Sequence, residues 1–140
     1  MPKITREEVR VPADVMPEAR DEYITNYLKA TRETGRLMLF ACDQKIEHLN
    51  KDFYGEGIDI ADLDPEHLFK IGSEGVCGVL AGQRGLVAQY AADYPEINYL
   101  IKMNSKTNLV GTKQEDPYSP QLYDLDAVLA MKEAGVNIVG

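Results

Sequence analysis

A cluster of ionisable side chains follows directly after the first strongly apolar run of the sequence. The run is LMLFAC, and Asp43, Lys45, Glu47 and His48 all come within the next six positions. Carboxylate, amine and imidazole groups held in one pocket can transfer protons and stabilise charge on a substrate. The segment therefore fits the edge of an active site. A plainer alternative is that Asp43 only caps the turn after a strand.

A second charged residue stands inside an apolar segment further along the chain. In INYLIKMN, apolar residues flank Lys102, and Asn104 and Lys106 follow closely in NSKTN. An unpaired ammonium group is costly to bury. Lys102 therefore needs a carboxylate partner such as Asp43, a route to solvent, or a functional site. Lys106 lies in a polar loop, where a lysine is more often simply solvated.

Helices and strands alternate along the chain in the order expected of a parallel α/β fold. Apolar residues at helical spacing predict helices, and short apolar runs between turn residues predict buried strands. The predicted strands are 37–42, 75–82, 97–104 and 136–140, and the predicted helices are 18–33, 64–72, 84–94 and 122–134. The strands begin roughly 33 residues apart, which is the size of one βα unit.

This arrangement predicts that Asp43 and Lys102 meet. Ligands of parallel α/β folds bind beyond the carboxyl ends of the strands. Alternation along a strand puts Asp43 on the same face as Ala41, and puts Lys102 on the same face as Leu100 and Asn104. If both faces point into a barrel, an acid and an amine converge on one pocket from strands two places apart.

The length of the chain suggests part of a larger domain. A complete (β/α)₈ barrel needs roughly 250 residues, whereas this sequence has 140 and ends inside its fourth predicted strand. We therefore expect a partial TIM barrel of about four βα units in residues 37–140, preceded by an arm and a helix in residues 1–36. The open edges of such a half-barrel would favour poor solubility or self-association in size-exclusion chromatography.

Composition argues against several classes of partner. A net charge of −8 disfavours nucleic acid and anionic membranes, because phosphate contacts come mainly from Lys and Arg. No apolar run approaches the ~20 residues that span a bilayer, and the charged N-terminus shows no secretory signal. Cys42 and Cys77 lie in apolar stretches, as expected of reduced, buried thiols. We predict a cytoplasmic protein.

Other site types lack their sequence signatures. Glu47 and His48 follow Asp43 closely, but the spacing matches no recognised zinc motif, and His67 has no obvious second ligand. The chain contains neither a G-x-S-x-G elbow nor a Walker A motif. GSEGVCGVLAG is rich in glycine but does not match G-x-G-x-x-G. We therefore expect no metal and no dinucleotide.

The two charged segments together resemble the archaeal-type, DhnA-like class I fructose-1,6-bisphosphate aldolases. Asp43 matches the acid of the Asp-His-Gly that ends the family's first strand, and the continuation Ile-Glu-His reaches His48. Gln44 and Lys45 replace His-Gly, which puts substrate identity in question, because a glycine permits backbone conformations that a lysine does not readily adopt. Downstream, YLIKMNSKTNLVG matches the family's lysine followed by Asn-x-Lys-Thr.

The resemblance implies a TIM barrel without cofactor that cleaves fructose 1,6-bisphosphate reversibly through a lysine imine, in glycolysis or gluconeogenesis. It implies that Asp43 assists proton transfer and that Lys102 supplies positive charge near substrate oxygens. Asn104, Lys106 and His48 are carried over as substrate-binding residues. The family's full-length members form homo-oligomers.

The imine-forming lysine of the family lies on the sixth strand and an essential tyrosine follows the fourth, so the resemblance places both beyond Gly140. We therefore expect the 140-residue chain alone to be inactive, and Lys102 not to be the nucleophile. Two alternatives remain open. One is a related transaldolase-type aldolase of deoxy-sugar or aromatic-precursor synthesis, and the other is a non-catalytic half-barrel that binds a sugar phosphate.

Overall fold

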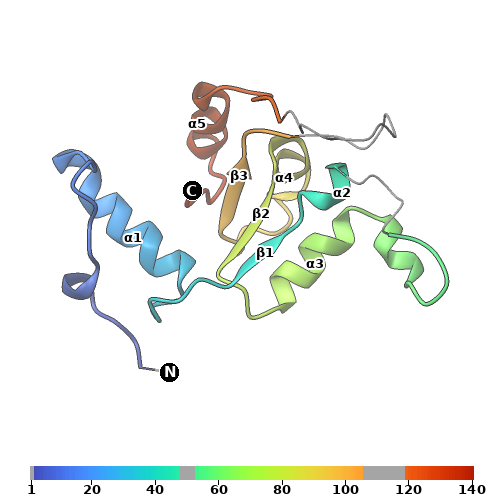
Figure 1. Ribbon diagram of the computed structural model, residues 1–140, viewed down its shortest axis with the longest axis horizontal. Helices are drawn as coiled ribbons and strands as arrows, with labels where there is room; N and C mark the ends of the chain where they lie inside the picture. Colours follow the sequence, from blue (N-terminus) through green and yellow to red (C-terminus); the bar gives the residue numbers. More distant parts are fainter. Residues whose placement is uncertain (1, 48–52, 106–118) are drawn as a thin grey trace.

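The computed structural model describes residues 2–47, 53–105 and 119–140 (Figure 1). Its centre is a parallel sheet in the order β1-β2-β3, formed by β1 (Leu39–Ala41), β2 (Val79–Gln83) and β3 (Tyr99–Lys102). Between the strands lie α3 (Glu66–Glu74) and α4 (Arg84–Tyr90). The predicted parallel α/β class is confirmed for these three strands.

The predicted fourth strand is present only as a bridge beside β3. Ile138 pairs with Tyr99 in parallel, and the Tyr99 N–H donates to the Asn137 carbonyl at 2.9 Å while the Val139 N–H donates to the Tyr99 carbonyl at 2.9 Å. The segment therefore continues the sheet, but it is too short to count as a full strand.

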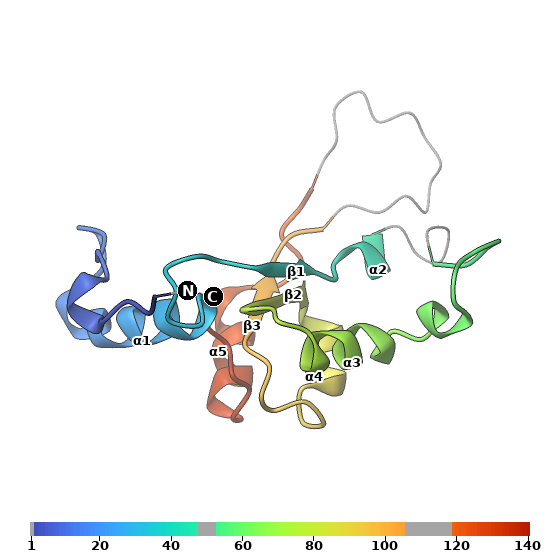
Figure 2. The same ribbon diagram turned by 90° about the horizontal axis from the view of Figure 1, so that it is seen from below.

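Three helices cover one face of the sheet. Figure 2 shows α3, α4 and α5 (Leu125–Glu133) on the same side of the three strands. Asp124 is the N-cap of α5 and accepts from the Ala127 N–H at 3.0 Å. Asp64 stands one residue before the N-cap of α3 and accepts from the Glu66 N–H, also at 3.0 Å. The remaining elements are short or peripheral: η1 (Arg6–Glu8), η2 (Pro17–Ala19), α1 (Arg20–Ala30), α2 (Gln44–Glu47) and η3 (Ile60–Leu63).

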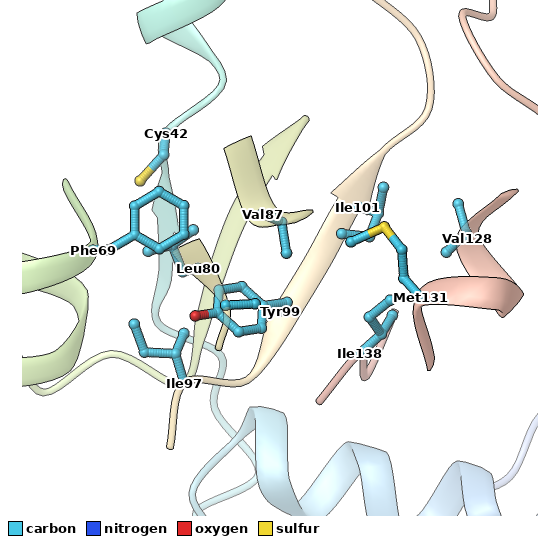
Figure 3. Close-up of a cluster of buried hydrophobic side chains, with 11 residues drawn as sticks. Cys42, Phe69, Leu80, Val87, Ile97, Tyr99, Ile101, Val128, Met131 and Ile138 are labelled. Carbon is cyan, nitrogen blue, oxygen red and sulfur yellow. The ribbon is translucent and has the colours of Figure 1, made fainter. Parts of the chain in front are cut away.

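The apolar core lies between the sheet and these helices (Figure 3). Leu80 and Tyr99 are in register on neighbouring strands, so they point to the same face, and both are fully buried. Phe69 of α3, Val87 of α4 and Met131 of α5 pack in the same cluster. Burial of these side chains supplies the main force that holds the helices on the sheet.

Helix α1 docks against the amino ends of the strands. The side-chain amide of Asn98 donates to the carbonyls of Lys29, at 3.3 Å, and Gly78, at 2.9 Å. Asn137 donates to the Asn98 side-chain oxygen at 2.8 Å and accepts from the Lys29 ammonium at 3.2 Å. A side chain at Gly78 would meet the Ala30 carbonyl oxygen, since its Cβ would lie 1.8 Å away. The last turn of α1 is thus held by β2, β3 and the 136–140 segment.

The prediction that the first strand is buried on both faces is wrong. Leu37 and Met38 are 54% and 62% exposed, and Leu39 is also exposed. The described helices cover only the face that carries Phe40, so the opposite face of β1 meets no other layer of described residues. Several predicted bounds also shift: the first helix is shorter than 18–33, and α3 continues past residue 72 to Glu74.

The two cysteines are free. Cys42 is buried, as predicted, whereas Cys77 is only half-buried. Burial, helped by the neighbouring Asp43 carboxylate, raises the pKa of the Cys42 thiol to about 12. Separately, none of the helices within residues 2–47, 53–105 and 119–140 has the length and apolar character needed to cross a bilayer.

Candidate active site

Lys102 is held between two carboxylates at the carboxyl ends of β1 and β3. Its ammonium group donates to Asp43 Oδ2 and to Glu47 Oε1, each at 2.6 Å. The side chains are 25%, 20% and 8% exposed for Lys102, Asp43 and Glu47. Ser105 also donates to Glu47 Oε1, at 3.1 Å. The predicted convergence of Asp43 and Lys102 is therefore present in the structure.

The turn after β1 brings the two carboxylates to the same place. The Asp43 carbonyl accepts from the N–H groups of Ile46 and Glu47, both at 3.1 Å, so the chain enters the short helix α2 at once. Residues four apart on a helix lie on the same face. Asp43 and Glu47 therefore point together toward Lys102 on β3.

This environment keeps Lys102 protonated. Partial burial lowers the pKa of the ammonium group, but hydrogen bonds and charge from Asp43 and Glu47 outweigh it, so the pKa of Lys102 lies above its ordinary 10.5. A lysine that forms an imine must attack as the neutral amine. A lysine held as an ammonium ion can stabilise negative charge on an oxygen atom that lies close to it.

Comparisons with known proteins bear on the family of this chain. Residues 37–140, which contain the whole sheet, match the model of the DeoC/LacD aldolase family. The chain belongs to this aldolase family. It is 50% identical over 140 residues to the fructose-bisphosphate aldolase/6-deoxy-5-ketofructose 1-phosphate synthase of Methanocaldococcus jannaschii, with 99% of this chain and 44% of that protein aligned.

A solved structure is also similar to this chain. The fructose-bisphosphate aldolase from Slackia heliotrinireducens is 75% identical in sequence and superposes with a TM-score of 0.94. The alignment again covers 99% of this chain and 44% of the other. The chain thus spans less than half the length of both relatives.

Tyr123 supports Lys102 from the backbone side. Its hydroxyl donates to the Lys102 carbonyl and accepts from the Arg84 N–H at 2.9 Å. One hydroxyl therefore ties the end of β3 to the start of α4. The Arg84 guanidinium adds a contact to α5 by donating to the Ala127 carbonyl at 3.3 Å. Because Lys102 is the last residue of β3, these bonds hold the backbone from which its side chain extends.

We expect Tyr123→Phe to lower the free energy of unfolding of the protein by about 1–2 kcal/mol. The change leaves the Arg84 N–H and the Lys102 carbonyl without their shared partner. Urea denaturation measures the loss, and Tyr54→Phe, at an exposed tyrosine, is the matched control. If both variants unfold at the same urea concentration, the Tyr123 bridge does not hold β3 in place.

Lys45 stands where the resembled pattern has a glycine, and the backbone accommodates it without strain. It lies in α2, and no positive φ is found at this position. Its ammonium group donates to the Asp62 carbonyl at 2.5 Å and sits 4.3 Å from the centre of the Phe53 ring. Burial lowers the pKa of Lys45, and the charges of Asp62 and Asp64 oppose that shift. The lysine thus anchors the 53–62 segment beside α2.

Of the remaining predicted site residues, only Asn104 lies in the part of the chain that the structure describes. Asn104 is exposed and its side-chain amide donates to Ser119 at 3.1 Å. His48 and Lys106 lie outside the described residues. Their substrate-binding roles remain predictions.

Glu47, Gln83 and Tyr123 each contact Asp43 or Lys102 but were absent from the predicted site. Glu47 could have been found from its position four residues after Asp43, which matches a helical turn. Gln83 ends β2 in register with Lys102, and its side-chain amide donates to the Asp43 carbonyl at 3.3 Å. The only signal for Gln83 is its polar side chain at the end of an apolar strand.

Proposed function

We propose that this chain supplies the first strands of the active site of a class I, Schiff-base fructose-bisphosphate aldolase. The observation that carries the proposal is the Lys102 ammonium group, held by Asp43 and Glu47 at the carboxyl ends of the strands. Both similar proteins are named as fructose-bisphosphate aldolases. The substrate is fructose 1,6-bisphosphate and the products are dihydroxyacetone phosphate and glyceraldehyde 3-phosphate, as in glycolysis and gluconeogenesis.

The proposed fold of the whole aldolase is a (β/α)₈ barrel, with this chain as its first βα units. In that fold, side chains at the carboxyl ends of the strands line the active site. The sheet face that carries Lys102 is the one that α3, α4 and α5 leave uncovered. This is the face that would point into the barrel. A cytoplasmic, homo-oligomeric enzyme is expected on the same resemblance.

In the proposed reaction an imine-forming lysine elsewhere in the barrel attacks the ketose carbonyl, and water is lost. The C4 hydroxyl then gives up its proton, the C3–C4 bond breaks, and its electrons pass into the iminium to form an enamine. Asp43 is placed to move protons in these steps. Lys102 stabilises negative charge that develops on substrate oxygens, and Glu47 holds its ammonium group in position.

We expect the 140-residue chain alone to form no adduct with dihydroxyacetone phosphate and borohydride. Borohydride reduces an imine to a stable secondary amine, so mass spectrometry reports which lysine reacted. Lys102 should stay unmodified because it is held as an ammonium ion. The same sequence extended to the length of its relatives should be trapped on a different lysine. An adduct on Lys102 would contradict this assignment, and absence of any adduct in the extended protein would reject the Schiff-base mechanism.

A second candidate keeps the chemistry but changes the substrate. The Methanocaldococcus relative is also named as a 6-deoxy-5-ketofructose 1-phosphate synthase, which favours a transaldol step that makes a deoxy-sugar. Comparing cleavage of fructose 1,6-bisphosphate with transfer to a dicarbonyl acceptor separates the two. Binding of the sugar phosphate without cleavage in the extended protein would instead support the non-catalytic alternative.

A further inference from the structure

Gln83 lies at the carboxyl end of β2, the strand between those that lead to Asp43 and carry Lys102. It pairs in register with Lys102 across β2 and β3. The β1–β2 register ends where Ala41 pairs with Ala81, and in the turn that follows, the Asp43 carbonyl accepts from the Gln83 side chain at 3.3 Å. Residues in register point to the same face of a sheet. Gln83 and Lys102 therefore lie side by side on the face that the helices leave uncovered, and Asp43 contacts both.

The side chain of Gln83 is almost fully buried, and only one of its two polar atoms makes a hydrogen bond. It is 5% exposed, and its Nε2 donates to the Asp43 carbonyl at 3.3 Å. Its Oε1 is buried and, within the part of the chain that the structure describes, receives no hydrogen bond. Because Nε2 faces a carbonyl oxygen, rotating the amide by 180° would bring two acceptors together. The orientation that leaves Oε1 unpaired is thus fixed by its neighbour.

A buried acceptor without a donor lowers stability, and native proteins rarely keep one. An apolar residue of similar length, such as methionine, would fill the same space without leaving an acceptor unpaired. Oε1 is therefore suited to a donor brought by a ligand. An ionised phosphate carries acceptors only and would meet the nearby carboxylates of Asp43 and Glu47. A hydroxyl group fits both requirements, because it donates and is neutral.

We propose that Gln83 is a specificity-determining residue whose Oε1 accepts a hydrogen bond from a hydroxyl on the carbon chain of the ketose. This inference rests on the proposed aldolase function. The amide has no proton-transfer role, so the hydroxyl it recognises keeps its proton during the reaction. In fructose 1,6-bisphosphate that leaves the hydroxyls on C3 and C5, since the C4 hydroxyl is the one deprotonated in cleavage.

The test is Gln83→Met in the protein extended to the length of its relatives. Steady-state cleavage is measured with fructose 1,6-bisphosphate and with its 3-deoxy and 5-deoxy analogues. With glutamine present, removing the recognised hydroxyl should lower kcat/KM about tenfold, as expected for one hydrogen bond. With methionine at position 83, the ratio of kcat/KM for fructose 1,6-bisphosphate to kcat/KM for that deoxy analogue should fall to about one. Gln89→Met, the same change at an exposed position of α4, should leave every ratio unchanged.

A stability measurement separates recognition from a structural role. Without ligand, the melting temperature of Gln83→Met should stay within about 2 °C of the parent or rise, because the unpaired oxygen is removed. The proposal is overturned if Gln83→Met lowers kcat/KM equally for all three substrates, has no effect, or melts much earlier with a uniform loss of activity. If the parent enzyme cleaves no ketose phosphate, the proposed function fails and this inference fails with it.

Discussion

Replacing Lys102 with methionine should lower kcat/KM for aldol cleavage by about a thousandfold. Removing one preorganised charge from an active site typically costs two to three orders of magnitude. The same change leaves Asp43 and Glu47 facing each other without the ammonium group that each contacts at 2.6 Å. Truncating one partner of such a pair also destabilises the fold, here by about 2–3 kcal/mol. Cleavage assays and urea denaturation of the extended protein measure the two effects.

A second substitution separates catalysis from folding. Glu47→Gln added to Lys102→Met removes one of the two facing charges, so stability should recover in part while activity stays low. Lys70→Met is the matched control. That lysine pairs with Glu66 at 3.6 Å on an exposed face, where an ion pair contributes little. Recovery of activity in the double variant would mean that Lys102 acts only through folding.

Alkaline pH offers an independent test of Lys102. Its pKa is raised in the folded protein, so its contribution to stability is fully present below the unfolded pKa of about 10.4. The contribution is lost as the pH rises through the higher pKa of the folded state. Above about pH 10.5, stability should therefore fall more steeply with Lys102 present than in Lys102→Met. If the free energy of unfolding falls equally steeply with pH in both proteins, Lys102 does not form the described ion pair.

The second large effect is expected at Gly78, far from the active site. Gly78→Ala should lower the free energy of unfolding by about 3 kcal/mol or more. The added Cβ would lie 1.8 Å from the Ala30 carbonyl oxygen and 2.9 Å from its carbon. Both are backbone atoms, so α1 must move away from the sheet to make room. Forced overpacking of this kind is among the few mechanisms that give large losses.

Gly85→Ala is the matched control for Gly78→Ala. Nothing lies within 4 Å of a Cβ at Gly85, which is in α4. The same substitution there should raise stability by up to about 1 kcal/mol, because alanine favours helix more than glycine does. Urea denaturation compares the two. A loss below about 1 kcal/mol for Gly78→Ala would show that α1 does not dock as described.

The elements that position the site could be read from the sequence because their signals are local. Alternation in two apolar segments, together with a parallel sheet, was enough to predict that Asp43 and Lys102 meet, as their 2.6 Å contact confirms. The exposure of β1 could not be predicted in this way. An apolar run shows that a strand can be buried, but burial depends on which other layer covers it. For Leu37 and Met38 no described layer does so.

The rest of the site depends on tertiary contacts. Gln83 meets Lys102 through the register of β2 and β3 and meets Asp43 through a side-chain hydrogen bond. Tyr123 reaches the Lys102 carbonyl from 21 residues away in sequence. A long-range partner leaves no periodic pattern in the sequence, so no spacing rule identifies it.

The docking of α1 limits where a truncated form of the protein can begin. The family match begins at residue 37, which makes Leu37 a natural place to start a recombinant protein. Such trimming would delete Lys29, whose carbonyl and ammonium groups bond to Asn98 and Asn137. It would also delete Ala30, whose carbonyl lies against Gly78. It would remove one hydrogen-bond partner each from Asn98 and Asn137 and expose the start of β2 to solvent. The cut should therefore be placed before the helix.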